Sequence, residues 1–287
     1  GEIVPVDLEN TSTQSEEGEV FVLKNSAAKV TLSNLMVIKE YEYKNTDKVM
    51  SEVFPKLGNK LTFLVGGKRF DKPLNFKQTS EKSIQFSSQD LEGTIKLNKK
   101  GQLIVNANSQ KGLQFINSIS SKEESKDQKV NNFVYYTDEL TTEPVEEDAF
   151  EEKDLKVGWF GIDYNYHVLA FVVPSTSYHI KGENSQLKVA NLKPSNNVEI
   201  KISFLKKNYD DLVGLGDNLK NAVDFGIWSV IALPMLRGLQ LFYSYLQNWG
   251  LAIIFLTILI RLAMFPLQHS SFKSMKKMQV LQPELKK

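Results

Sequence analysis

The chain has 287 residues, enough for one large domain or two ordinary ones, and a formal net charge of +1. A charge so close to zero gives no overall electrostatic basis for binding nucleic acid, so DNA is not expected as a partner. Because the sequence contains no cysteine, disulfides, thiol nucleophiles and cysteine-ligated metals are all excluded. The charge is nevertheless uneven. Nine acidic residues face one lysine from Asp138 to Asp154, and five lysines face one glutamate from His269 to Lys287. That asymmetry indicates two environments rather than one uniform surface.

Residues 1–18 are polar and rich in Ser, Thr and Glu, which predicts a flexible lead-in. From residue 19 to 207 the pattern changes to short runs of Val, Ile, Phe, Leu and Thr between turn residues. Regular short runs of this kind predict an all-β domain, an antiparallel sandwich. The runs expected as strands are 19–23, 29–38, 61–65, 83–87, 93–97, 102–107, 114–119, 159–162, 167–173, 178–180, 187–190 and 198–205.

Two charged stretches interrupt this series, Ser121–Lys129 and Asp138–Asp154. Charged runs that can bury little apolar area stay in water, so both are expected to be solvated loops rather than binding sites. Three turns are expected on similar grounds: at Gly66-Gly67, at Asn98–Gly101 within a hairpin, and at Lys111-Gly112. Pro174 is expected to end the strand before it, because proline cannot donate to a sheet ladder.

A connecting helix is expected over residues 208–223, bent near Gly214 and Gly216, and a second helix over 224–247. On a helical wheel the polar residues of the second helix fall within roughly an 80° arc. One interpretation is an amphipathic helix lying in the membrane interface, and the alternative is a helix packed on a protein core. Pro234 should bend this helix by removing one backbone hydrogen bond. The residues of the polar arc are Ser229, Arg237, Gln240, Ser244 and Gln247.

Residues 248–268 are predicted to form a transmembrane helix. Its apolar run from Trp249 to Leu267 would be about 28 Å long, close to the roughly 30 Å hydrocarbon core of a bilayer. Its eleven Leu, Ile and Phe residues between Leu251 and Leu267 favour insertion by roughly 3 to 7 kcal/mol. Arg261 opposes this by about 2.5–3.5 kcal/mol at a helix centre, so the sum still favours the membrane.

The flanks of this helix give it a direction. Trp249 suits one membrane interface, and Lys273, Lys276 and Lys277 follow the other end. The positive-inside rule therefore places residues 269–287, the start of a basic loop, in the cytoplasm and the β-domain on the opposite side. In a Gram-negative bacterium that side is the periplasm.

Arg261 stands roughly 9 Å below the cytoplasmic end of the helix, and Thr257 lies one turn earlier on the same face. The arginine either extends to the interface without further function or faces a wet cavity inside the membrane. Physical arguments alone leave these two interpretations open.

A string of short motifs surrounds this arginine: Asn248-Trp249-Gly250, then Thr257 and Arg261, Pro266-Leu267, and further motifs downstream. At this spacing the string resembles the first core transmembrane helix of the YidC/Oxa/Alb membrane-protein insertases. The stretch from Asp224 to Trp228, with Pro234, resembles the amphipathic helix that precedes it in that family. The downstream motifs are Ser274-Met275, Lys277-Met278 and Leu281-Gln282-Pro283.

The resemblance implies an insertase that helps inner-membrane proteins to insert and fold, alone or with the Sec translocon and its accessory subunits. It implies a hydrophilic intramembrane groove in which Arg261 corresponds to the family's arginine and Thr257 lines the same wall. The partners implied are nascent membrane proteins, the Sec translocon and the lipid bilayer, and the basic tail also allows the ribosome. The location implied is the bacterial inner membrane, multi-pass, with the large domain in the periplasm. That domain is expected to be β-supersandwich-like.

The sequence departs from the family pattern because it holds one core helix, so it is expected to be a piece of a longer protein that supplies the rest of the groove. The alternative function is a membrane-anchored carbohydrate-binding or carbohydrate-modifying β-sandwich domain. A modifying enzyme needs positioned acids or bases, and His167, His179 and His269 are not clustered in the sequence. No catalytic residue, cofactor site or metal site is predicted, and the chain is expected not to be an enzyme.

Overall fold

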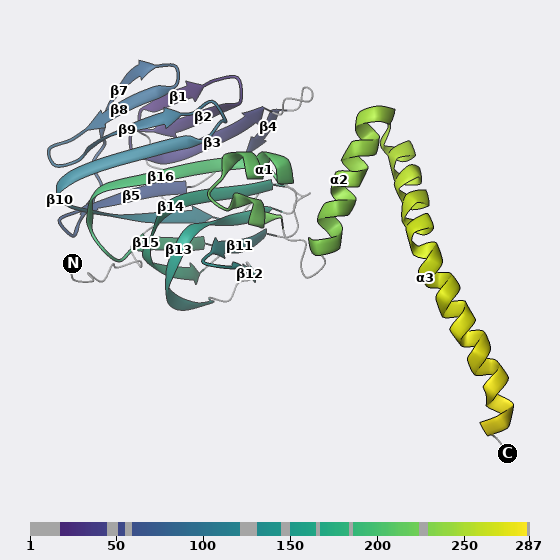
Figure 1. Ribbon diagram of the computed structural model, residues 1–287. Helices are drawn as coiled ribbons and strands as arrows, with labels where there is room; N and C mark the ends of the chain where they lie inside the picture. The colour runs from purple at the N-terminus through teal and green to yellow at the C-terminus, as the bar shows by residue number, and fades with distance from the viewer. Residues whose placement is uncertain are drawn as a thin grey trace. The chain divides into compact units, whose positions relative to one another are not determined.

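The computed structural model of the chain describes residues 18–44, 51–54, 59–120, 131–144, 150–164, 167–183, 186–223 and 229–285. The chain divides after Val223 into two compact units (Figure 1). The first unit contains all the strands that the structure describes, with a short helix and a 3-10 turn at its end. The second unit is a pair of helices. The prediction of an all-β domain followed by a helical membrane segment is therefore confirmed. The finer designation as a β-supersandwich remains a prediction.

The described strands and helices are β1 (Val20–Lys24), β2 (Ala28–Ser33), β3 (Val37–Lys44), β4 (Ser51–Phe54), β5 (Asn59–Val65), β6 (Lys68–Phe70), β7 (Asn75–Ser80), β8 (Ser83–Ser87), β9 (Glu92–Leu97), β10 (Leu103–Ser120), β11 (Asn131–Tyr136), β12 (Leu140–Pro144), β13 (Phe150–Tyr164), β14 (His167–Glu183), β15 (Gln186–Asn191), β16 (Ser195–Lys206), α1 (Tyr209–Leu215), the 3-10 turn η1 (Leu219–Ala222), α2 (Ser229–Leu246) and α3 (Trp249–Leu285).

The strands pair antiparallel into one folded sheet with two halves that share long strands. The early part of β10, from Leu103 to Asn108, pairs with β9 and β16. Its later part pairs with β5 and β15. β14 changes partner in the same way, from β16 to β15, while β13 follows it along both parts. We call the part built on β1, β2, β3, β5 and β15 the first half. The second half is built on β7, β8, β9, β16, β11 and β12.

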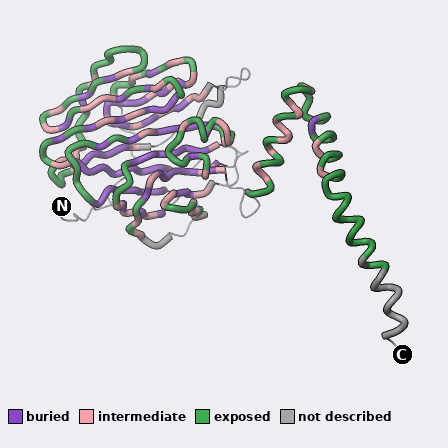
Figure 2. The backbone as a smooth tube through the Cα atoms, viewed as in Figure 1, coloured by how far each residue is buried: buried purple, intermediate pink, exposed green. Residues whose placement is uncertain are grey.

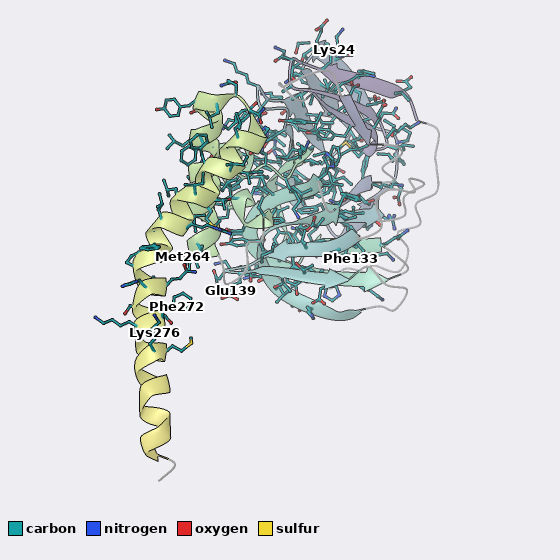
Figure 3. The ribbon with its side chains drawn as sticks, turned by 90° about the vertical axis from the view of Figure 1, so that its right-hand side faces the viewer. Lys24, Phe133, Glu139, Met264, Phe272 and Lys276 are labelled. Atoms are coloured by element: carbon teal, nitrogen blue, oxygen red, sulfur yellow. The ribbon has the colours of Figure 1, made fainter. Side chains whose placement is uncertain are left out.

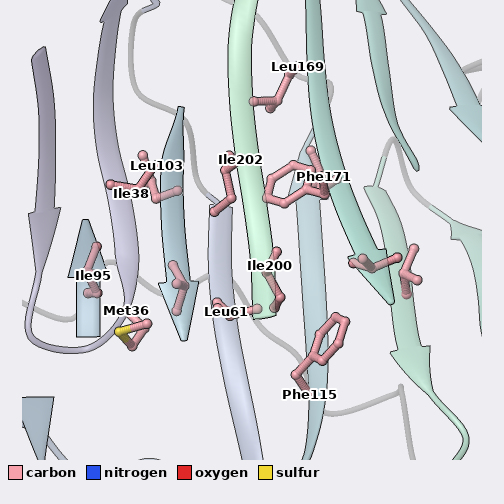
Figure 4. Close-up of a cluster of buried hydrophobic side chains, with 14 of the residues drawn as sticks. Met36, Ile38, Leu61, Ile95, Leu103, Phe115, Leu169, Phe171, Ile200 and Ile202 are labelled. Carbon is pink, nitrogen blue, oxygen red and sulfur yellow. The ribbon is translucent and has the colours of Figure 1, made fainter. Parts of the chain in front are cut away.

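The main hydrophobic core lies between these halves. Leu61 and Phe115 reach it from the first half, and Phe171, Ile200 and Ile202 reach it from the second (Figure 4). Side chains alternate along a strand, so the residues next to these in sequence point to the outer faces of the sheet. Figure 2 shows the result as buried strands inside an exposed surface.

The outer face of the second half carries a core of its own. Trp159 and Leu205 lie there with other alternate residues of β13, β14 and β16. Leu212 of α1 and Leu219 of η1 pack against them. Asn208 caps α1, because its side-chain oxygen accepts from the backbone N–H of Asp210 at 3.0 Å. The expected break between the helical segments occurs at Gly216, whose φ is +82°.

Two expected strand boundaries were wrong. The run 29–38 is two strands, β2 and β3, joined by a tight turn in which Met36 has a φ of +58°. That turn was hidden because Leu35 and Met36 are apolar, and Met36 is buried in the core. The runs 102–107 and 114–119 form a single strand, β10, in which Lys111-Gly112 is a bulge. The pairing register shifts there and Gly112 has a φ of +79°.

Pro174 does not end a strand, and Asp138–Asp154 is not one long loop. β14 runs through Pro174 because the proline lies in a register shift, between the pairs Trp159–Val172 and Val157–Thr176, where no ladder bond is lost. β12 and the start of β13 occupy much of the acidic stretch. Glu143 accepts a hydrogen bond from the Lys153 ammonium at 2.9 Å there, so part of the charge is paired within the sheet.

Several expectations fall on residues outside the described ranges. They are the lead-in up to residue 17, the loop 121–130, residues 145–149 of the acidic stretch, and residues 224–228 at the start of the second predicted helix. Within the described part, the backbone from 269 to 285 is helical and continues α3, where the start of a basic loop was expected. The apolar part of α3 and the charged residues after it form one continuous helix, Trp249–Leu285.

Candidate functional site: the polar stripe of α3

The second unit is a helical hairpin with a short connection. α2 ends in Gln247, whose φ of +51° is left-handed and whose N–H bonds to the Tyr243 carbonyl at 2.8 Å. Asn248 then starts α3, because its side-chain oxygen accepts from the Leu251 N–H at 3.2 Å. Because these two caps are consecutive, no loop separates the helices, and α2 and α3 pack against each other.

The hairpin gives a physical reason for the sequence Asn248-Trp249-Gly250. The asparagine caps α3, and the Trp249 ring stacks on Tyr243 of α2 with centroids 3.9 Å apart. A side chain at Gly250 would start 3.2 Å from the capping oxygen, which is too close for most contacts. Each residue of the motif therefore serves the turn.

The two helices pack through small and aromatic residues. Ala252 of α3 is buried, and the rings of Phe242 and Phe255 lie 6.1 Å apart. At Gly238 a Cβ atom would come within 3.1 Å of a Leu256 methyl, so the glycine permits close approach. These contacts fix which face of α3 points towards α2.

The remaining circumference of α3 is exposed, as Figure 2 shows along most of its length. Met264, Phe272 and Lys276 project outward from it in Figure 3. The stretch Trp249–Lys273 is long and apolar enough to cross a membrane, whereas α2 has a shorter apolar helix, Val230–Leu246. An exposed apolar surface of this extent is what lipid or other membrane helices would cover.

Thr257 and Arg261 both lie on this exposed surface, one turn apart. The Thr257 hydroxyl donates to the Ile253 carbonyl at 2.7 Å, so its hydrogen-bonding capacity is partly met within the helix. The Arg261 guanidinium has no hydrogen bond or ion pair with any residue that the structure describes. Among the residues that the structure describes, none compensates the charge of this arginine in its apolar helix.

Arg261 also lies in a shallow hollow on α3. Gln268, seven residues further on and hence on the same helix face, lines this hollow with it. We define the polar stripe as Thr257, Arg261 and Gln268. The sequence prediction missed Gln268, although its spacing of seven from the arginine was visible. The other residues of the hollow are apolar: Ile258, Leu262, Met264 and Phe265.

The three histidines are placed separately. The His167 ring stacks on Phe204, with centroids 5.6 Å apart, and His179 Nδ1 lies 2.6 Å from the Asp154 carboxylate. His269 belongs to the other unit, where it stacks on Phe265. Among the described residues they form no acid–base cluster, so the carbohydrate-modifying alternative gains no site from them.

Polar residues of α2 gather as the helical wheel predicted. Arg237 donates to the Gln240 side chain at 3.0 Å, and Ser244 and Gln247 bond to nearby backbone carbonyls of α2. All of these hydrogen bonds stay within the helix. They are therefore compatible both with a helix in the membrane interface and with a helix packed on a protein core. The assignment of α2 to the membrane interface therefore stays a prediction.

The chain thus combines an all-β domain with a helix that is long and apolar enough to cross a membrane and that carries an arginine. Residues 241–287 match the family described as 60Kd inner membrane protein. This description agrees with the resemblance of the same part of the chain to the YidC/Oxa/Alb membrane-protein insertases.

Three relatives share the description "Membrane protein insertase YidC". The protein of Geotalea daltonii is 45% identical over 91 residues, which is 32% of this chain and 17% of the relative. That of Syntrophus aciditrophicus is 37% identical over 142 residues, 45% of this chain and 26% of the relative. That of Geobacter metallireducens is 34% identical over 161 residues, 52% of this chain and 30% of the relative. The chain thus matches less than a third of each relative's length. The shared description is of an insertase rather than an enzyme.

Among solved structures, the α-N-acetylgalactosaminidase NagBb of Bifidobacterium bifidum aligns with a TM-score of 0.33 and 7% identity. The alignment covers 65% of this chain and 36% of that one. A likeness this low carries no argument about fold or function.

Proposed function

We propose that this chain is part of a membrane-protein insertase of the bacterial inner membrane. Its polar stripe would form one wall of a hydrophilic groove that receives polar segments of nascent membrane proteins. The groove is completed by further helices of a multi-pass protein that works alone or with the Sec translocon and its accessory subunits. The observation that carries this proposal is Arg261, exposed on an apolar helix with its charge unmatched by any described residue.

The energetic argument concerns the polar part of an incoming protein. A polar group that crosses hydrocarbon without a hydrogen-bond partner costs several kcal/mol, roughly 2–7 depending on the reference state. A groove lined by Arg261, Thr257 and Gln268 offers such a group water and side-chain partners while its apolar neighbours enter lipid. Arginine keeps its charge at any physiological pH, so it also attracts acidic residues in the translocated segment.

The orientation proposed follows from the charges around α3. Lys273, Lys276 and Lys277 follow the apolar stretch, and the positive-inside rule places them in the cytoplasm. The β-domain precedes the helix and would then lie in the periplasm. The basic end of α3 would be where nascent chains, and with them the ribosome, arrive.

Depletion of the native insertase and rescue by the full-length protein tests the stripe. We expect Arg261→Glu combined with Thr257→Ala to slow the insertion of substrates with acidic translocated segments by about tenfold. A change of this size corresponds to the loss of one ion pair between the arginine and an acidic residue of the substrate. Arg261→Lys retains the charge and should rescue insertion largely. The Arg237→Glu variant is the control for the charge reversal, because it makes the same arginine-to-glutamate change on α2, outside the stripe.

Immunoblots of the membrane fraction must show equal amounts of every variant. Wild-type insertion of all tested substrates by the Arg261→Glu/Thr257→Ala protein would contradict the groove role of the stripe. Equal defects in the Arg261→Glu/Thr257→Ala and Arg237→Glu proteins would show that an added acid disturbs the hairpin in general.

A further inference from the structure

The polar stripe lies on the far side of α3 from α2. Phe255 and Leu256 of α3 contact α2, and the buried Ala252 lies between them around the helix. At 100° per residue, the centre of the stripe is roughly 160° around the helix axis from the centre of these three residues. The side chains of the stripe therefore point away from α2.

The polar residues of α2 have the same arrangement with respect to α3. Gly238 and Phe242 lie against α3, and the centre of the described polar side chains of α2 is again roughly 160° from them around the helix. The hairpin therefore has an apolar centre between two polar faces, each of which points away from the other helix. The polar residues concerned are Arg237, Gln240, Ser244 and Gln247.

The contact between the two helices is close enough to fix the rotation of α3. A Cβ atom at Gly238 would lie 3.1 Å from Cδ1 of Leu256, so a larger residue requires the leucine to move. Membrane helices approach each other closely at such small residues. Nearer the connection, the rings of Tyr243 and Trp249 stack with centroids 3.9 Å apart. Because α3 is held at two points along its length, packing favours one rotation about its axis.

We propose that α2 positions the polar stripe. The contact of Gly238 with Leu256 holds α3 in the rotation that directs Thr257 and Arg261 into the groove. This inference rests on the proposed function, because it requires a groove on the stripe side of α3. A rotation by one residue, about 100°, would carry the arginine out of that groove. Gly238 and Leu256 are thus positioning residues, which act through α3 and contact no substrate.

Labelling of single thiols in intact membranes tests this positioning in a full-length protein without other cysteines. A water-soluble maleimide reacts with Thr257→Cys only while that position faces water. Gly238→Leu places a branched side chain against Leu256 and should lower this labelling rate at least about tenfold, because the reactive thiolate does not form in hydrocarbon. The rate should rise at Ile253→Cys or at Ile258→Cys, since these exposed residues flank the stripe on its two sides. Insertion of substrates should fall in parallel.

Two further variants separate positioning from a general loss of structure. Ser244→Leu adds a leucine to the exposed polar face of α2, away from α3, and should change neither labelling nor insertion. Leu256→Ala combined with Gly238→Leu moves bulk from one helix to the other, so it should restore both the labelling of Thr257→Cys and insertion. Such a rescue requires that the two positions be in direct contact, and a hairpin that had simply unfolded would not show it.

An unchanged labelling rate of Thr257→Cys in the Gly238→Leu protein would overturn the positioning role, whatever happens to insertion. It would assign the orientation of α3 to the preference of Arg261 for water. If Thr257→Cys is unreactive even beside an unaltered Gly238, the groove itself is contradicted. The contact is then tested alone by oxidising the pair Gly238→Cys and Leu256→Cys, where a disulfide supports the contact and its absence overturns it.

Discussion

Two glycines three positions apart in β13 have opposite surroundings. A Cβ atom at Gly161 would overlap the backbone carbonyl of Leu169 on β14, its neighbour in the sheet. A Cβ atom at Gly158 would meet its nearest neighbour, a ring carbon of Tyr136, at an ordinary 3.8 Å. The stretch Gly158-Trp159-Phe160-Gly161 of β13 therefore contains one glycine that the packing requires and one that it does not.

Gly161→Ala should destabilise the β-domain by about 1–3 kcal/mol, because a backbone carbonyl cannot move aside as a side chain can. Gly158→Ala should be neutral or stabilise by up to about 1 kcal/mol, since alanine restricts the unfolded chain more than glycine does. Urea denaturation of both variants, followed by circular dichroism, measures the difference. Equal midpoints for the two would show that the sheet adjusts at Gly161.

At the scale of elements, α1 holds the end of the β-domain through one side of a short helix. Leu212 is fully buried against the second sheet half, while its neighbour Val213 is 46% exposed. A helix of seven residues has little stability of its own, so this contact decides whether it forms.

Leu212→Ala should therefore cost about 2–5 kcal/mol, the range for removing a buried leucine side chain. Val213→Ala, the matched change one residue away, should stay within about 0.5 kcal/mol. Hydrogen exchange of residues 209–222 would distinguish local from global loss. Protection that falls only in this segment indicates detachment of α1 and η1, and similar stability of the two variants would contradict the packing argument.

Element types could be predicted from the sequence far better than element ends. The hairpin at Asn98–Gly101 follows from its turn residues, and Gly101 N–H does bond to the Asn98 carbonyl at 3.0 Å. The sequence around Met36 gave no comparable indication of a turn, because the turn residues are apolar. The sequence around Pro174 gave no indication that the proline lies in a bulge within a continuous strand. Their conformation is set by the strands that pair around them, which a single-sequence pattern does not contain.

The candidate site shows the same division. Thr257 and Arg261 could be placed on one helix face from their spacing alone, since the period of an α-helix is fixed. The face that α3 turns towards α2 depends on Gly238, Ala252 and Phe255, whose contacts appear only in three dimensions.

For the whole β-domain, buried tyrosines set the response to alkaline pH. Burial raises the pKa of Tyr178 to about 12, and burial also raises the pKa of Tyr41. In the unfolded chain a tyrosine titrates near pH 10, roughly its unperturbed value. The folded state therefore keeps protons that the unfolded state releases, so stability is retained below pH 10 and lost as the pH rises from about 10 to about 12.

Tyr178→Phe should make the fall of unfolding free energy above pH 10 shallower, because one of the linked protons is removed. At neutral pH the variant should lose about 0.5–1.5 kcal/mol, since the hydroxyl donates to the Pro174 carbonyl at 2.7 Å. Urea midpoints at half-unit steps from pH 8 to 11.5 measure both effects. Identical slopes for the variant and the parent would rule out Tyr178 as a contributor.

The long strands β10, β13 and β14 are each part of both sheet halves, and this has a mechanical consequence. In a sandwich of two separate sheets, a pulling force can separate one sheet from the other without breaking the hydrogen bonds between strands. Here three strands, β10, β13 and β14, each continue from one sheet half into the other. Separating the halves must therefore also break hydrogen bonds between strands within each half. A load applied between β1 and β16 is therefore carried by the whole β-domain, which should yield as one piece.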